Sequence, residues 1–252
     1  MDNKEKLWNK EFILICLVNL LTFTSFYFLL PTLPIFVMDV LHGDTRHVGY
    51  IIGILTLTAV MARPAAGYML DALGRKKIVV IALVCFAFTA FSYHIASSLL
   101  LLFSLRALHG FSWGFSSTGL GTMASDIVPS SRRGEGLGYY GMMTTIAMAI
   151  GPVLSLYILG QYGFTYLFAI SSGIAAIGVL LLFLITSSVE TLSEGQRKLT
   201  LDSFLERKVF SISAMVFFIA LTYGGIVSFI TLYAKELGVG NPGIYFLVYA
   251  VA

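Results

Sequence analysis

Long apolar runs, separated by short polar stretches, dominate the chain. A helix needs about 20 mainly apolar residues to cross the hydrocarbon core of a bilayer, which is about 30 Å thick. The runs are continuously apolar and do not alternate, so they predict helices and not the strands of a membrane barrel. We therefore expect an all-α, multi-pass membrane protein. The qualifying runs are 12–37, 47–70, 78–96, 99–124, 136–159, 162–186 and 210–232.

An eighth run begins near Gly243 and stops at Ala252, the last residue. Ten helical residues rise about 15 Å, half of the bilayer core. We therefore expect the chain to be a fragment of a longer protein. The charged stretch before the seventh run resembles a linker between two membrane domains. The expected organisation is a six-helix domain over 1–187, a cytoplasmic linker over 188–208, and the start of a second domain over 209–252.

Composition supports a membrane protein, because 58% of the residues are hydrophobic and only 12% are charged. Soluble domains carry about 25% charged residues. A net charge of +3 is too small an excess to indicate a nucleic-acid partner. The chain has no HExxH, no Walker loop, no G-x-S-x-G and no cluster of Cys and His. We therefore expect neither an enzyme nor a bound metal or cofactor.

Basic residues indicate how the spans are oriented, because cytoplasmic connections are enriched in Lys and Arg. Of the 16 basic residues, 12 fall in the N-terminal tail and the even-numbered connections. Only Arg46 and Lys235 fall on the other side, while Arg63 and Arg106 lie inside spans. We therefore expect the N-terminus to be cytoplasmic.

The end of the second run carries a glycine-rich, charged motif, R-P-A-A-G-Y-M-L-D-A-L-G-R-K-K. One glycine favours close helix approach, the second permits a tight turn, and the aspartate can cap a helix N-terminus. The motif resembles the loop signature of the major facilitator superfamily, G-x-L-x-D-[RK]-x-G-[RK]-[RK]. Met69 and Ala72 depart from that signature, and a simple basic turn is the alternative. The matching residues are Gly67, Asp71, Gly74, Arg75 and Lys76.

The fourth run resembles the R-x-x-x-G motif of the same superfamily. Arg106, Gly110 and Gly114 are spaced by four, so they share one helix face. A mid-span arginine costs about 2.5–3.5 kcal/mol on insertion scales, so it should face a cavity or a partner. Snorkelling to the interface is the alternative. His109, in the same motif, is either a packed histidine or a proton relay.

The fifth run resembles the superfamily's antiporter-associated motif, with its central Gly-Pro intact. Small side chains repeated every four residues favour close helix packing, and the proline favours a kink. An ordinary kinked packing helix is the alternative. The residues concerned are Gly138, Ala147, Gly151, Pro152 and Ser155.

The first run supplies candidate cavity residues. Its polar side chains should face the bundle interior, where partners exist. We predict that Arg106 points into a central cavity near Asn19. We also predict that Arg75 pairs with Asp126, and that Asp71 caps a helix of a missing second half. The candidate cavity residues of the first run are Asn19, Thr22, Phe23 and Phe26.

The resemblance implies half of a transporter, built of two inverted three-helix repeats, that works by alternating access. It further implies a secondary transporter of the bacterial plasma membrane, most similar to proton-coupled efflux proteins for drugs or sugars. The expected partners are lipid, a small molecule, protons and the missing C-terminal half, with the proton gradient as the energy source. No span has a carboxylate in its middle. Proton coupling would therefore use either an acid of the missing C-terminal half, or Arg106, His109 or a carboxylate at the end of a span. An uptake symporter and an inactive fragment are the alternatives.

Overall fold

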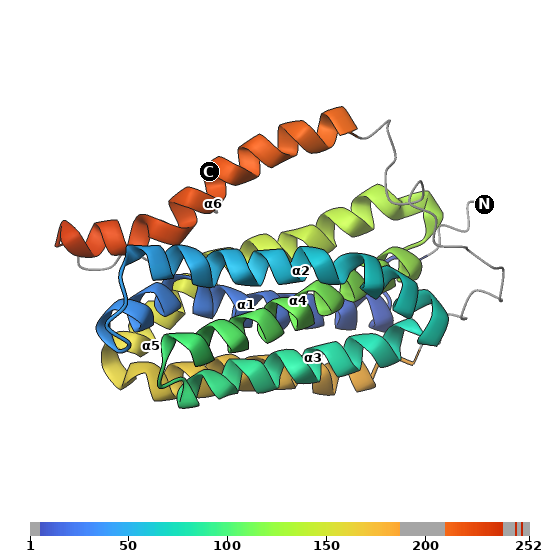
Figure 1. Ribbon diagram of the computed structural model, residues 1–252. Helices are drawn as coiled ribbons and strands as arrows, with labels where there is room; N and C mark the ends of the chain where they lie inside the picture. Colours follow the sequence, from blue (N-terminus) through green and yellow to red (C-terminus); the bar gives the residue numbers. More distant parts are fainter. Residues whose placement is uncertain (1–5, 187–209, 239–244, 246–247, 249–252) are drawn as a thin grey trace.

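The structure, a computed structural model, describes residues 6–186, 210–238, 245 and 248. Every regular element of this part is helical, as expected (Figure 1). The long helices lie roughly side by side, and short turns join α1 to α2, α2 to α3 and α3 to α4. The elements are α1 (Lys10–Asp39), α2 (Thr45–Leu73), α3 (Arg75–Ser92), η1 (Tyr93–Ile95), α4 (Leu99–Ile127), η2 (Ser130–Arg132), α5 (Arg133–Phe183) and α6 (Phe210–Glu236).

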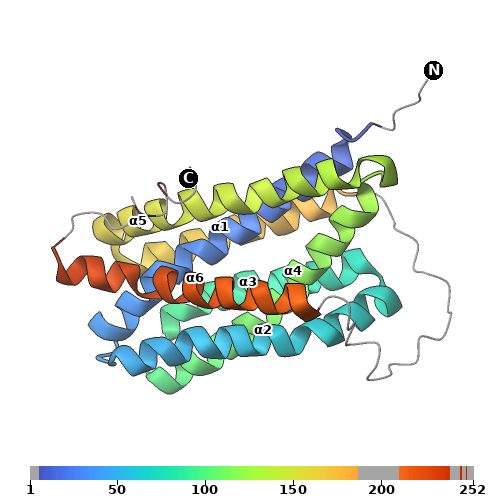
Figure 2. The same ribbon diagram turned by 90° about the horizontal axis from the view of Figure 1, so that it is seen from above.

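The predicted spans 136–159 and 162–186 both fall in α5, which folds back on itself. Gly163 interrupts the helix with φ 78° and ψ −175°, a conformation that side chains with a Cβ rarely adopt. The chain reverses there, as the lime-to-orange course of α5 shows (Figure 2). We call residues 133–162 the first arm of α5 and residues 164–183 the second arm. Each arm is long enough for one crossing.

Four described segments are long and apolar enough to cross a membrane: α1, α2, residues 75–95 and residues 130–183. The last, at 54 residues, contains both arms of α5. α4 is not in this set, although its 29 residues are sufficient in length. Its arginine, histidine, serines and glycines lower its mean hydropathy, and many of them are buried against neighbouring helices. α4 therefore packs its polar and small residues against protein, while Leu100, Leu108 and Phe111 stay exposed.

Polar contacts hold α1 to both arms of α5. The Asn19 amide donates to the Tyr140 carbonyl and to Thr144 Oγ1 on the first arm, both at 3.1 Å. Ser25 and Ser171 pair reciprocally across α1 and the second arm, each hydroxyl lying within 3.1 Å of the other residue's carbonyl oxygen. All three anchoring side chains, Asn19, Ser25 and Ser171, are fully buried. α1 is therefore fixed between the two arms.

Glycines set the contact between α2 and α4. A Cβ on Gly110 would lie 2.2 Å from both the Leu55 carbonyl oxygen and the Thr58 hydroxyl. A Cβ on Gly114 would lie 2.5 Å from the Ala59 carbonyl oxygen. Backbone-to-backbone approach of this kind is the usual role of small residues between membrane helices. The predicted packing face of α4 is therefore confirmed at these two positions.

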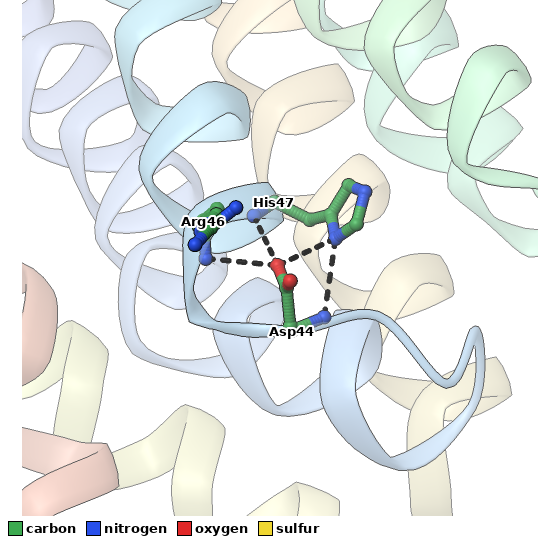
Figure 3. A network of polar contacts seen from close by, with 3 residues as sticks. All are labelled: Asp44, Arg46 and His47. Atoms are coloured by element: carbon green, nitrogen blue, oxygen red, sulfur yellow. Dashed lines mark hydrogen bonds and ion pairs between the residues drawn. The ribbon is translucent and has the colours of Figure 1, made fainter.

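The turn before α2 is closed by a capping box (Figure 3). Asp44 Oδ1 accepts the backbone N–H groups of Arg46 and His47 at 2.9 and 3.1 Å. The Asp44 N–H donates in turn to Nδ1 of His47 at 3.1 Å. The His47 backbone hydrogen bond is the main cause that lowers the pKa of Asp44 below its ordinary value. The start of α2 is therefore fixed by local contacts alone.

We predict that Gly110→Ala destabilises the protein and that Gly138→Ala does not. The added methyl at Gly110 would collide with α2, and overpacking costs about 1–3 kcal/mol. A Cβ at Gly138 meets nothing within 4 Å, so this variant controls for the higher helix propensity of alanine. Thermal unfolding in detergent, followed by circular dichroism, measures both. Equal melting temperatures would show that the α2–α4 contact does not limit stability.

Candidate functional site

Arg106 is buried near one end of the bundle, with only 2% of its surface exposed. Its Nε donates to the Ile51 carbonyl of α2 at 3.1 Å. Tyr93 and His109, three residues along α4 from Arg106, are also buried and lie 2.8 Å apart through the Tyr93 hydroxyl and His109 Nδ1. A guanidinium held this way is bound to α2 and buried by protein, which argues against the snorkelling alternative.

His109 is packed against α3. Its Nδ1 lies 2.8 Å from the Tyr93 hydroxyl, and its ring centroid is 4.3 Å from that of Phe86. The side chain is fully buried, and Nε2 has no hydrogen-bond partner among the described residues. These contacts favour the packed histidine over the proton relay.

The prediction that Arg106 lies near Asn19 is wrong, because the two residues lie at different depths. Asn19 is nine residues from the start of α1, and Arg106 is seven residues from the start of α4. These helices run in opposite directions, so the residues are about 14 Å and about 11 Å from opposite ends of a bundle about 45 Å long. Asn19 bonds to α5 and Arg106 to α2, so no single cavity wall contains both.

The middle of the bundle contains an aromatic seam between α1 and α4, formed by Phe23, Phe26 and Trp113. The rings of Phe26 and Trp113 are stacked, with centroids 4.2 Å apart and an interplanar angle of 13°. Phe23 meets Trp113 edge to face at 4.7 Å. Trp113 was not among the predicted site residues. Its position seven residues after Arg106 places both on one face of α4, which is the signal that could have identified it.

Charged residues gather where three helices end. Arg75, in the first turn of α3, forms an ion pair with Asp126 at the end of α4, as predicted. Asp71 Oδ1 lies 3.6 Å from another nitrogen of Arg75. Lys76 donates to the carbonyls of Phe183 and Ile185, at 3.1 and 2.6 Å. The basic first turn of α3 thus collects the carboxyl-terminal ends of α4 and of the second arm, whose dipoles favour cations.

A contact that the sequence did not reveal lies beside this cluster. The Glu11 carboxylate accepts the backbone N–H of Thr186 at 3.1 Å and its hydroxyl at 2.7 Å. Glu11 belongs to the first turn of α1, so α1 and α3 both hold the end of the second arm. The tail also contains Asp2 and Glu5, and no pattern distinguishes Glu11 from them or identifies its partner 175 residues away.

The other predicted residues differ in what surrounds them. Gly74 has φ 93°, as the tight turn requires. A Cβ on Gly151 would lie 2.8 Å from Cβ of Tyr27 on α1, and its neighbours on α5 are buried as well. Gly67 and Gly138 meet nothing within 4 Å in the described part, so their packing roles stay predictions. Thr22 donates to the Val18 carbonyl of its own helix. The buried neighbours of Gly151 are Ala147, Pro152 and Ser155.

The profile of the Major Facilitator Superfamily matches residues 15–252, almost the whole chain. The chain belongs to this superfamily. Similar proteins include Multidrug resistance protein 1 of Bacillus subtilis, 32% identical over 55% of this chain and 36% of the relative. Quinolone resistance protein NorA of Staphylococcus aureus is 25% identical over 90% of this chain and 58% of the relative.

Solved structures of the superfamily share the fold. A D-xylose-proton symporter matches 96% of this chain and 65% of its own, with a TM-score of 0.71 and 14% identity. The nucleoside transporter NupG matches 96% of this chain and 64% of its own, with a TM-score of 0.68 and 17% identity. The chain therefore spans less than two thirds of the length of these superfamily members.

We predict that the ion pair between Arg75 and Asp126 can be reversed. Arg75→Asp and Asp126→Arg alone each leave like charges together at the helix ends, so each should lower the melting temperature. The double variant restores opposite charges and should recover part of the loss. A double-mutant cycle of thermal unfolding measures the coupling. A double variant no more stable than the worse single variant would show that the pair contributes nothing.

Proposed function

We propose that the chain forms the first part of a secondary transporter that exports a small molecule in exchange for protons by alternating access. The observation that carries the proposal is the buried Arg106 within a superfamily fold. An arginine inside a span costs insertion energy and marks a functional site by default. In this mechanism the helix groups rock about a central site and no covalent chemistry occurs.

Export is favoured over uptake by two observations. The Gly151–Pro152 pair lies at the contact of α5 with α1, where a kink and a close approach suit a helix that moves during transport. Two of the similar proteins are named for multidrug or quinolone resistance. Uptake by the same machinery is the second candidate.

Proton coupling needs a group that changes protonation. Within the described spans, every Asp and Glu lies at or near a helix end, as Glu11, Asp71 and Asp126 do. The coupling acid of this proposal is therefore a boundary carboxylate or one outside the described residues. His109 is a weaker candidate because Tyr93 and Phe86 enclose it.

We predict that Arg106→Ala abolishes transport without preventing membrane insertion. The test expresses the protein from its own gene in cells and measures efflux of fluorescent dyes and labelled sugars, with and without a proton gradient. Arg106→Lys should rescue poorly, because lysine lacks the planar donor fork of the guanidinium. Accumulation in place of efflux would establish the uptake symporter. No transport by the parent protein, despite insertion, would establish the inactive fragment.

We predict a cytoplasmic N-terminus, so the turn before α2 faces outward and the turn after α4 faces the cytoplasm. Single cysteines at Thr45 and Ser131, in a background without Cys16 and Cys85, place a label at each turn. Both positions are exposed. A membrane-impermeant maleimide should label Thr45→Cys on intact cells and Ser131→Cys only after lysis. The opposite pattern would show that the N-terminus lies outside and that the predicted orientation is wrong.

A further inference from the structure

The short segment before α1, residues 6–9, is held on the bundle by a buried leucine. Leu7 has no exposed surface and belongs to a hydrophobic core cluster. A Cβ on Gly136, at the start of α5, would lie 3.0 Å from Cδ1 of Leu7, so the leucine rests against that glycine. The Asn9 side chain accepts the backbone N–H of Phe12 at 2.8 Å and caps α1. These contacts fix the segment where α1 and α5 begin.

Trp8, the next residue, is held beside α5 with much of its indole uncovered. Its ring centroid lies 4.8 Å from that of Tyr139 on α5 and 5.4 Å from that of Phe12 on α1. The side chain is nevertheless 53% exposed. Tryptophan and tyrosine are enriched at the membrane–water interface, because each has an apolar ring and a polar group. Trp8 stands just before the apolar run of α1, which is the level at which that interface is expected.

The charges at this end of the bundle leave several cations without a partner. The described carboxylates here are already held by protein groups. In contrast, Lys6 and Lys10 are exposed and make no ion pair or side-chain hydrogen bond with a described residue. They stand two residues before and two residues after Trp8. The held carboxylates are Glu11, bound to Thr186, Asp71 and Asp126, bound to Arg75, and Glu135, bound to Arg132.

We propose that Lys6, Trp8 and Lys10 bind the headgroup region of an anionic phospholipid. In this site the two lysines pair with the negative headgroup, and the indole lies against the upper part of the acyl chains. A zwitterionic lipid carries its own cation, so it gains less from the lysines. The ligand is a lipid and not a free phosphate, because the exposed indole stabilises only a partner with an apolar chain. The site does not depend on the proposed transport function.

Quenching of Trp8 by brominated lipid tests the proposal in nanodiscs. Trp8 and Trp113 are the two tryptophans, so Trp113→Phe leaves Trp8 as the sole emitter. Phosphatidylglycerol or phosphatidylcholine, brominated near the headgroup end of an acyl chain, replaces a rising fraction of the unbrominated lipid. Bromine quenches an indole at short range, so the two titrations compare the lipids beside Trp8. Trp8→Phe, in which only Trp113 emits, measures quenching unrelated to this site.

The expected result is that phosphatidylglycerol binds beside Trp8 about tenfold more tightly than phosphatidylcholine, and that salt weakens this preference. Lys6→Gln and Lys10→Gln should each lower the preference about threefold. Lys77→Gln is the matched control, because it removes an exposed cation of α3 at the same end of the bundle, and it should keep the preference. All three lysines are exposed, so the variants should fold.

Four outcomes would overturn the proposal. The first is equal quenching of Trp8 by the two lipids. If Trp113→Phe fails to fold, the difference between the parent protein and Trp8→Phe gives the same comparison. The second is strong quenching by acrylamide dissolved in water with none by brominated lipid, which would place the indole outside the membrane. The third is an unchanged preference in both lysine variants. The fourth is loss of the preference on adding soluble glycerol phosphate at constant ionic strength, which would indicate a site for free phosphate.

Discussion

Inside a bilayer, a side-chain hydroxyl, amide or guanidinium can find hydrogen-bond partners only in the protein itself, and this requirement decides which helices of this chain stay together. Asn19 and Ser25 find theirs on α5, and Arg106 finds its partner on α2. Apolar side chains contribute no such selection, because lipid tails are as apolar as leucine. A few buried polar groups therefore determine which helices are neighbours, and the many apolar side chains pack the space between them.

The two ends of the bundle are organised by different means. At one end, consecutive basic residues in the first turn of α3 hold two other helices, Arg75 through Asp126 and Lys76 through free carbonyls. At the other end, the capping box of Asp44 stabilises α2 within its own first turn. The contacts of α3 link separate helices, so a displacement of one helix would break them. The capping box lies within α2, so it would stay intact.

The sequence was sufficient for features that depend on local patterns. Apolar runs predicted the helices, Gly74 predicted the turn, and the spacing of Gly110 and Gly114 predicted a packing face. The Arg75–Asp126 pair followed from the resemblance of the motifs. Depth along the bundle was not predictable in the same way, because it depends on where each helix begins. α1 and α4 run in opposite directions, and Asn19 and Arg106 each lie near the start of their helix. The two residues therefore lie toward opposite ends of the bundle.

The sequence also offered little indication of which of several similar residues make tertiary contacts. Many aromatic residues line the spans, and ordinary membrane packing accounts for most of them. Trp113 stacks on Phe26, whereas Phe88 is 66% exposed, and the spacing of Trp113 from Arg106 was the one hint of this difference in the sequence. Likewise, nothing in the tail of the chain marks Glu11 as the residue that holds Thr186.

The position of α1 between the arms of α5 has a consequence for how the protein is made. The hydroxyl of Ser25 waits for a partner 146 residues later in the chain. At about 5–20 residues per second, the ribosome needs about 7–30 s to deliver it. During that interval the Ser25 hydroxyl can bond only within its own helix or to its surroundings. The contact between the first helix to leave the ribosome and the second arm of α5 can therefore form only after the hairpin at Gly163 has been synthesised.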